Sequence, residues 1–242
     1  NSGADYAKFQ TYFTKKRAKP GSKIQDILGA CELNIHQFAE LKEFCDSLDI
    51  GFASTAFCEE SAQLLEDIGC KFIKVASFQI GNTELIESLS RGNWIKELWV
   101  STGMSNPGEI MSAHKILTDK SSVISDRFCF MHCVSQYPVK KLSDYSLINI
   151  PWLEEITGKS AGYSDHTLGS KAAVLAVTLG ARLIEKHFTI DNALNGADHA
   201  MSANPDAFSD LVIKCQEAEI MIGDKTRSES YSCEKDCLQF KD

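Results

Sequence analysis

Two histidines follow neighbouring strand-like runs of this chain, in the segments Ser164-Asp165-His166-Thr167 and Glu185-Lys186-His187-Phe188-Thr189. The residues between them, Leu168 to Ile184, have the pattern of one helix and one strand, so both histidines are predicted at the same end of adjacent parallel strands. Two imidazoles with open positions suit a catalytic divalent ion, because a closed structural site has a full set of protein ligands. We therefore predict that His166 and His187 bind a metal ion.

Lysines and hydroxyl residues stand at the ends of the other strand-like runs. Such a set can hold an oxyanion, because lysine is a point charge and each hydroxyl can donate a hydrogen bond. Lys8 and Gln10 alternate with Phe9 and so point to one side of their strand, and a lysine inside a fold needs an anionic partner. A phosphorylated substrate is the predicted ligand. A single serine or threonine here is more often a helix cap, but we interpret the whole set as a site. Its members are Lys8, Gln10, Ser54, Thr55, Lys74, Ser77, Ser101, Thr102, His132, Ser135, Tyr137 and Ser164.

The elements that must position these residues alternate regularly along the chain. Runs rich in β-branched and aromatic residues predict strands at Tyr6–Gln10, Gly51–Thr55, Phe72–Ser77, Leu98–Thr102, Phe128–Val134, Ala161–Asp165 and Leu183–His187. Helices are predicted at His36–Leu48, Glu59–Ile68, Asn82–Leu89, Pro107–Leu117, Ile148–Ile156, Gly169–Leu179 and Pro205–Ile222. Gly69, Gly180 and Gly223 follow three of these helices, where a left-handed closing residue is expected. The regular alternation of strands and helices predicts a parallel sheet.

An open doubly wound sheet and a closed barrel both contain such units. No Gly-x-Gly-x-x-Gly follows the first strand, and polar residues end every strand instead of clustering at one switch point. We therefore predict the α/β class with the architecture of a (β/α)₈ TIM barrel, whose active site is assembled from many strand ends. Since seven strands are one short of closure, a first strand-helix unit is expected upstream of residue 1. The barrel domain is placed at residues 1–223 and a polar linker or tail at 224–242.

Composition limits the classes of partner. The 242 residues include 25 basic and 33 acidic ones, a net charge of −8, which gives no general attraction for nucleic acid or anionic membranes. No apolar run approaches the roughly 20 residues needed to cross a bilayer, and the N-terminus has no signal layout, so a soluble, cytoplasmic protein is expected. The nine cysteines form no Cys-x-x-Cys pair, which indicates free thiols in a reduced compartment.

Taken together, the strand-end motifs resemble those of the sialic acid synthases. The similarity runs in order through about residues 3–223 and comprises Lys8-Phe9-Gln10-Thr11, Ser54-Thr55-Ala56-Phe57, Lys74-Val75-Ala76-Ser77, Ser101-Thr102-Gly103-Met104, His132-Cys133 with Tyr137-Pro138, Gly162 to Gly169, and Glu185 to Thr189 with Asp198. The resemblance implies a barrel that condenses phosphoenolpyruvate with the open-chain aldehyde of an N-acylated hexosamine, such as N-acetylmannosamine. The products would be a sialic or other nonulosonic acid and phosphate.

The same resemblance implies a role for each motif. His166 and His187 would hold Mn²⁺ or Mg²⁺, and the ion would polarise the sugar aldehyde. Expected phosphoenolpyruvate-binding residues are Lys8, Thr55, Lys74, Ser77, Ser101, Ser135 and Ser164. Expected sugar-binding residues are Gln10, Tyr137 and Asp198, and expected catalytic residues are Gln79 and His187. The resemblance also implies a C-terminal antifreeze-like domain, expected to be missing here, and a homodimer in the full-length protein.

Two departures from the family pattern leave alternatives open. The family usually has a glutamate at the position of Gln79, and an amide can hydrogen-bond a water but cannot take its proton. Ser135 is typical of relatives that make pseudaminic acid, whereas Asp198 with the following histidine is typical of relatives that make sialic and legionaminic acids. The identity of the acceptor sugar is therefore left undetermined. A non-catalytic relative that binds sugar or phosphate is one alternative. A Schiff-base aldolase using Lys74 or Lys186 is another.

Overall fold

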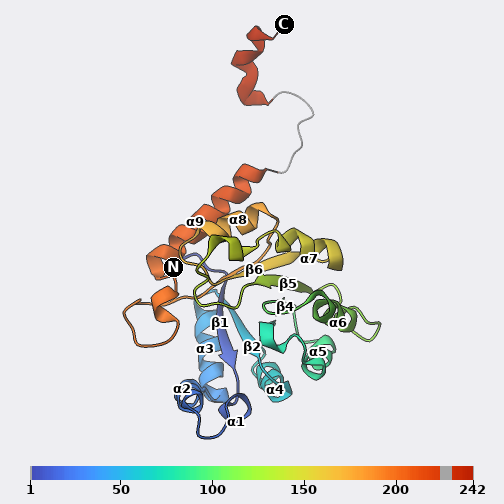
Figure 1. The fold of residues 1–242 in the computed structure, drawn as a ribbon, viewed down its shortest axis with the longest axis vertical. Coiled ribbons are helices and arrows are strands. Elements are labelled where there is room, and N and C mark those ends of the chain that lie inside the picture. The colour runs from blue at the N-terminus through green and yellow to red at the C-terminus, as the bar shows by residue number, and fades with distance from the viewer. Residues whose placement is uncertain (1, 224–230, 242) are drawn as a thin grey trace.

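The computed structural model describes residues 2–223 and 231–241. Within these residues seven strands form one sheet in which each strand pairs in parallel with the next along the chain. The strands are β1 Tyr6–Thr11, β2 Gly51–Ala56, β3 Phe72–Val75, β4 Glu97–Ser101, β5 Phe128–Cys133, β6 Ala161–Asp165 and β7 Ile184–Lys186. Figure 1 shows the sheet curling, with the helices on its outer side.

Helices make the crossovers between successive strands. The α-helices are α1 Thr14–Arg17, α2 Lys23–Cys31, α3 Ile35–Ser47, α4 Glu59–Asp67, α5 Thr83–Ser90, α6 Pro107–Leu117, α7 Asn149–Thr157, α8 Lys171–Thr178 and α9 Pro205–Ile222. Short 3₁₀ helices are η1 Ser77–Gln79, η2 Leu142–Tyr145, η3 His199–Met201 and η4 Ser232–Phe240. Asparagine side chains cap the N-termini of α3, α5, α6 and α9, as the backbone donors there require. None of the helices in the described residues is long and apolar enough to cross a bilayer.

The predicted elements are present, with boundary shifts of a few residues and two omissions. The prediction missed α1 and α2, which lie in the first crossover. It also extended the third strand too far, because β3 ends at Val75 and η1 carries Ser77 and Gln79. The predicted linker or tail at 224–242 falls partly outside the described residues, at 224–230, and its remainder contains η4.

Within the described residues the backbone hydrogen bonds do not close the curved sheet, so it is a half-barrel that is open between its two outer strands. Its order runs from β1 to β7, and these two outer strands are not paired with each other within the described residues. Their side chains nevertheless meet, because Lys8 Nζ on β1 lies 3.2 Å from Glu185 Oε1 on β7. The described residues therefore form seven strands of a barrel-like sheet whose two edges are close at the C-terminal ends of the strands.

Alternate side chains along each strand point to the concave side of the sheet, where they form layers. The layer nearer the strand N-termini is apolar and consists of Ala53, Trp99, Cys129 and Met131 packed with Tyr6, Phe72 and Leu183. Two residues further along, the inward positions are polar: Lys8, Thr55, Lys74, Ser101 and Glu185. A larger core, including Phe38, Leu65, Ile73, Leu85 and Leu98, fills the space between the sheet and the helices. On the concave side of the sheet, a layer of polar side chains therefore lies directly on a layer of apolar side chains.

Candidate active site

Glu185 joins the two lysines of the polar layer. Its Oε1 lies 3.2 Å from Lys8 Nζ, and its Oε2 accepts a hydrogen bond from Lys74 Nζ. Lys8 Nζ also donates to Thr55 Oγ1 at 3.2 Å, and Lys74 Nζ donates to Ser164 Oγ at 3.3 Å. Two ammonium groups and one carboxylate leave a net positive charge among buried groups, so the layer still attracts an anion.

The ion pairs affect the charge states of the side chains in this layer. Burial raises the pKa of Glu185, but the nearby ammonium groups of Lys74 and Lys8 outweigh it and hold that pKa below its usual range. Burial also lowers the pKa of Lys8, and the carboxylate of Glu185 opposes this change. Glu185 is therefore ionised at neutral pH.

Sequence reasoning missed Glu185. It recognised that a buried lysine needs an anionic partner but assigned that partner to a substrate, whereas the protein supplies a carboxylate of its own. The available signal was the period of two along the last strand, which places Glu185 on the same side as Leu183 and His187.

Two serines and a cysteine from neighbouring strand ends, Ser77, Ser135 and Cys133, lie against Gly103. The backbone N–H of Gly103 donates to Ser77 Oγ at 3.1 Å, and a Cβ at this glycine would overlap the hydroxyls of Ser77 and Ser135. The hydroxyls of Ser101 and Ser135 are buried and have no hydrogen-bond partner among the described residues. Buried hydroxyls are normally paired. These two are therefore available to an oxyanion of a ligand.

His166 and His187 lie side by side, with ring centroids 5.3 Å apart. His166 Nδ1 is 2.8 Å from the carbonyl oxygen of Val134, which can only accept, so Nδ1 carries a proton and, in the neutral ring, Nε2 has the free lone pair. His187 Nδ1 is 3.6 Å from Asp198 Oδ2. A carbonyl or carboxylate behind the ring is the usual support of a metal-binding histidine.

The charge state of His187 also suits a metal ligand. Burial and the adjacent His166 lower the pKa of His187 to about 4, so the ring is neutral at pH 7, as a ligand must be. In residues 2–223 and 231–241 no third His, Cys, Asp or Glu completes a metal-binding group with this pair. The two imidazoles therefore fit an ion that takes its other ligands from water or substrate.

The structure brings two of the three predicted sugar-binding residues to the histidine pair. The ring of Tyr137 is 4.2 Å from that of His166 and 5.8 Å from that of His187, and half of its surface is exposed. Asp198 stands behind His187, as described above. Gln10 is separate from them: it lies exposed at the end of β1, where its Oε1 is 3.5 Å from Arg17 Nη1.

Gln79 lies at the rim of the polar layer. It is half-buried in η1, two residues beyond Ser77, and its Oε1 accepts a hydrogen bond from Asn82 Nδ2 at 2.9 Å. No described contact joins Gln79 to His187, so the two residues predicted as catalytic do not touch in this structure. The side-chain N–H₂ of Gln79 has no recorded acceptor and can donate to a ligand or a water.

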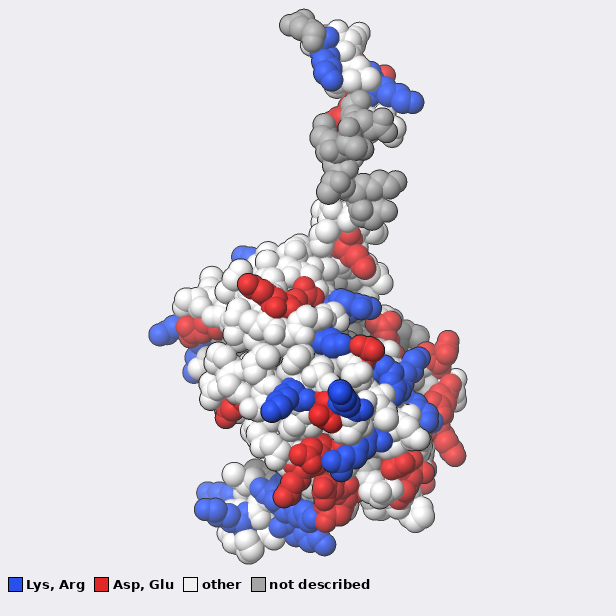
Figure 2. Space-filling view, turned by 90° about the vertical axis from the view of Figure 1, so that its right-hand side faces the viewer, with Lys and Arg blue, Asp and Glu red and all other residues white. Residues whose placement is uncertain are grey.

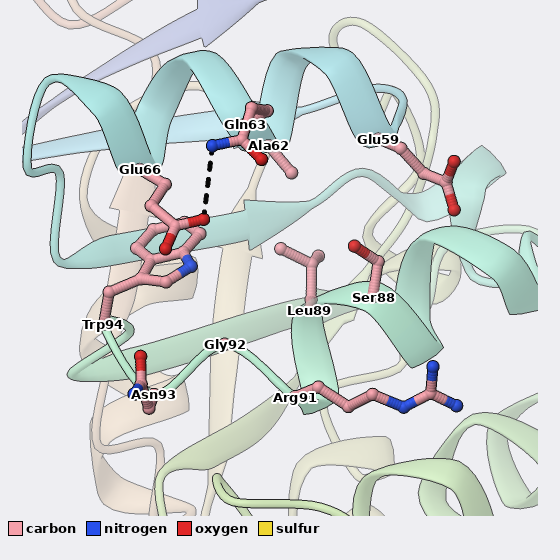
Figure 3. Close-up of a pocket in the computed structure, with 10 residues that line it drawn as sticks. All are labelled: Glu59, Ala62, Gln63, Glu66, Ser88, Leu89, Arg91, Gly92, Asn93 and Trp94. Carbon is pink, nitrogen blue, oxygen red and sulfur yellow. Dashed lines mark hydrogen bonds between the residues drawn. The ribbon is translucent and has the colours of Figure 1, made fainter.

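One groove on the surface adjoins the end of β7 and is lined by residues that include Leu168, Lys186 and Met201. Another, of about 150 Å³, runs between α4 and α5, away from the polar layer (Figure 3). Its lining residues are Glu59, Ala62, Gln63, Glu66, Ser88, Leu89, Arg91, Gly92, Asn93 and Trp94. None of them is a predicted site residue. The candidate site itself is a layer of side chains joined by its own ion pairs.

Comparison with known proteins yields one family. The family model described as the NeuB family matches residues 1–227. An uncharacterized protein of Methanocaldococcus jannaschii is 37% identical over 221 residues, which are 91% of this chain and 64% of that protein. The pseudaminic acid synthase of Helicobacter pylori is 33% identical over 239 residues, 93% of this chain and 68% of that enzyme. The N,N'-diacetyllegionaminic acid synthase of Legionella pneumophila is also 33% identical, over 92% of this chain and 66% of that enzyme.

A solved structure agrees with these sequence matches. The crystal structure of the N-acetylneuraminic acid synthetase of Leptospira borgpetersenii, in complex with citrate, has a TM-score of 0.90 and 30% sequence identity. The match covers 99% of this chain and 81% of that one. This chain spans about two thirds of the length of the sequence relatives named above.

Proposed function

Because this chain belongs to the NeuB family, we propose that it condenses phosphoenolpyruvate with an N-acylated hexosamine to give a nonulosonic acid and phosphate. Relatives are named as synthases of legionaminic, pseudaminic and N-acetylneuraminic acids, which leaves N-acetylmannosamine or a related sugar as the acceptor. The observation that carries the proposal is the pair of lysines joined by Glu185, the partly buried Lys8 and the buried Lys74, together with two buried strand-end hydroxyls that have no partner among the described residues.

Phosphoenolpyruvate has two anionic groups, a phosphate and a carboxylate, and the polar layer has two ammonium groups to receive them. Lys8 and Lys74 supply charge, while Glu185 keeps them apart and oriented. The hydroxyls of Ser101 and Ser135 lack partners, so binding an oxyanion costs them no existing hydrogen bond. The remaining proposed contacts are those of Thr55, Ser77 and Ser164.

The acceptor sugar is proposed to bind above this layer, beside the histidines. His166 and His187 would hold the divalent ion, Mn²⁺ or Mg²⁺, which when bound supplies a Lewis acid for the sugar aldehyde. The exposed ring of Tyr137 covers both imidazoles, and Asp198 holds His187 from behind. These residues would orient the aldehyde over C3 of phosphoenolpyruvate.

The proposed reaction forms a bond between C3 of phosphoenolpyruvate and the aldehyde carbon, whose oxygen becomes a hydroxyl. Water adds at C2 and gives up one proton, the C–O bond to phosphate breaks so that the phosphate leaves with the electron pair, and the C2 hydroxyl loses its proton to become the keto group. Of the two protons released, one balances the protonation of the former aldehyde oxygen. Gln79 can orient this water through its side-chain N–H₂, because its carbonyl oxygen is bonded to Asn82. An amide cannot accept the water's proton, which must therefore pass to solvent or to the departing phosphate.

The test is release of phosphate from phosphoenolpyruvate with N-acetylmannosamine and Mn²⁺. Release that requires the sugar, stops with EDTA and is lost in His187→Ala is the expected result. The assay is repeated with other N-acylated hexosamines, including diacetylated ones. Absence of release with every acceptor would overturn the proposal.

A non-catalytic relative that binds the same ligands is the second candidate, and Gln79 is the residue that favours it. Binding of phosphoenolpyruvate without turnover, unrepaired by Gln79→Glu, would support this candidate. A Schiff-base aldolase has less support. Lys74 is ion-paired with Glu185, and Lys186 Nζ is 2.7 Å from Asp165 Oδ2, so each amine is engaged with a carboxylate rather than free to attack a carbonyl. Borohydride trapping of pyruvate on either lysine would restore that alternative.

A further inference from the structure

A guanidinium without a carboxylate partner stands at the C-terminal end of β1. The Cζ atom of Arg17 lies 4.0 Å from the ring centre of Phe57, 5.0 Å from that of Tyr12 and 5.5 Å from that of Phe78. Its nearest recorded acceptor is Gln10 Oε1, at 3.5 Å. In the described part of the chain no Asp or Glu forms an ion pair with it. Most of its N–H donors are therefore left for a ligand or for water.

Aromatic packing fixes the position of this guanidinium. The Tyr12 hydroxyl donates to the backbone carbonyl of Leu28 at 3.0 Å, and its ring meets Phe57 edge-on. Phe57 in turn stacks on Phe78, with ring centroids 5.7 Å apart. A planar guanidinium held against aromatic faces loses little further freedom when it binds an oxyanion in a bidentate manner.

The acidic side chains nearby are engaged elsewhere. Glu60 pairs with Lys16, and Glu32 accepts a hydrogen bond from the backbone N–H of Thr14 at 2.8 Å. Lys15 and Lys16 precede Arg17 in α1, so the local charge is positive. Figure 2 shows lysine and arginine side chains gathered at the lower end of the molecule, where Figure 1 places α1 and α2.

Arg17 borders the candidate site through Gln10 and Phe78. Gln10, its hydrogen-bond partner, follows Lys8 by two residues on the same side of β1. Phe78, which it contacts, lies between Ser77 and Gln79 in η1. A ligand that extends from the polar layer past Gln10 therefore meets the free edge of this guanidinium.

We propose that Arg17 is a specificity residue that selects acceptor sugars carrying an oxyanion, either a phosphate ester or a carboxylate, at the end remote from the aldehyde. The inference rests on the proposed synthase function, which places the aldehyde at the histidine pair. Burial lowers the pKa of Arg17, and an anionic substituent on the sugar would favour the charged guanidinium.

The test compares three acceptors: N-acetylmannosamine, its 6-phosphate and the corresponding uronic acid, each with phosphoenolpyruvate and Mn²⁺. The wild-type chain is expected to have a KM for a charged acceptor about ten- to a hundredfold below that for the neutral one. Arg17→Gln should remove this preference with little change in kcat. Arg17→Lys should keep part of it, because the charge remains but the bidentate geometry is lost. The two charged acceptors show which oxyanion is preferred.

Lys15→Gln provides the matched control, since it removes the same charge from an exposed position of the same helix. It should leave the preference within about twofold of wild type. An equal rise of KM for neutral and charged sugars in Arg17→Gln would show a structural role and overturn the inference. An unchanged preference in that variant would overturn it as well.

Failure of the inference and failure of the proposed function give different results. If no acceptor supports phosphate release, the proposed function fails, and calorimetric binding of the phosphorylated and neutral sugars to wild type and Arg17→Gln becomes the deciding measurement. Tighter binding of the phosphorylated sugar that depends on Arg17 supports the inference. Equal binding of both sugars to the wild-type chain contradicts it.

Discussion

Lys8 and Glu185 form an ion pair of 3.2 Å between the first and the last strand of a sheet in which those strands share no ladder within the described residues. The same carboxylate reaches Lys74 on β3. Side-chain charge therefore brings the two edges of the sheet together at the end where the candidate site lies. This contact gives Glu185 both a structural role and a role in binding.

Glu185→Gln should destabilise the fold and strengthen anion binding. Removing the carboxylate leaves two buried ammonium groups without a counter-charge, which is expected to lower the free energy of unfolding by about 2 to 4 kcal/mol. The same change should tighten the binding of inorganic phosphate, because phosphate then replaces the missing anion. Urea unfolding and calorimetry measure the two effects. Glu84→Gln, at an exposed position of α5, is the control and should change neither quantity appreciably. Weaker phosphate binding in Glu185→Gln would contradict the assignment.

Gly103→Ala should block the oxyanion site. A methyl group there would overlap the hydroxyls of Ser77 and Ser135, so phosphoenolpyruvate binding is expected to weaken by at least about tenfold while the protein stays folded. The double variant Gly103→Ala/Ser135→Gly removes one of the overlapping hydroxyls and should recover part of the binding. Gly81→Ala is a matched control, since nothing lies within 4 Å of the added atom. Unchanged binding in Gly103→Ala would place the anion elsewhere.

Asp198→Asn should weaken Mn²⁺ binding without abolishing it. The carboxylate stands 3.6 Å behind His187 Nδ1, and loss of such support typically reduces metal affinity about 10- to 100-fold. His166→Ala and His187→Ala each remove a ligand and should reduce the affinity further. Electron paramagnetic resonance of free Mn²⁺ during titration gives the affinity independently of activity. Equal affinity in wild type and His187→Ala would rule out this pair as the metal site.

Gln79→Glu should raise kcat for phosphate release, because a carboxylate can take the proton that the amide cannot. General-base catalysis is typically worth about 100- to 10,000-fold, and a gain within or below that range with little change in KM is expected. Gln63→Glu, on the exposed face of α4, controls for the added negative charge. No gain in kcat at any pH between 6 and 9 would show that this position is not the base.

Thiol reactivity provides a test of the packing. Burial raises the pKa of Cys129 to about 12 and that of Cys70 to about 11, so neither should be alkylated in the native protein at pH 8. The exposed thiols of Cys31, Cys233 and Cys237 should react readily. Mass spectrometry after iodoacetamide treatment, with and without urea, distinguishes the two groups. Rapid labelling of native Cys129 would be inconsistent with the inner apolar layer.

The order of strands and helices could be predicted from the sequence because each strand has inward and outward residues of strong β propensity and each crossover has a helical pattern. The first crossover was the exception. Residues 14–31 are interrupted by Pro20 and Gly21, and α1 has only four residues, so it leaves little periodic signal. The signal of α2 was available but overlooked, because Ile24, Ile27 and Leu28 have helical spacing. The extent of β3 was also overestimated, because the polar run that follows it forms a 3₁₀ turn.

The site was partly predictable for the same reason. Strand-end positions meet at one edge of a parallel sheet, so Lys8, Lys74 and the histidine pair were expected together and lie together. The carboxylate partner of the lysines was not foreseen, although the period of two along the last strand places Glu185 on the same side as the inward-facing Leu183. The stacking of Arg17 could not have been predicted, because it depends on three aromatic side chains from separate loops.

The apolar layer of Tyr6, Phe72 and Trp99 has a kinetic consequence. These rings pack against one another beneath the lysines and block passage from the N-terminal ends of the strands. Within the described residues, ligands are therefore expected to reach the buried Lys74 from the C-terminal ends of the strands, where the exposed Tyr137 lies. Under the proposed function, the anion that binds deepest must arrive before the sugar and depart after the new nine-carbon product. Product inhibition by phosphate should therefore be competitive toward phosphoenolpyruvate and not toward the sugar.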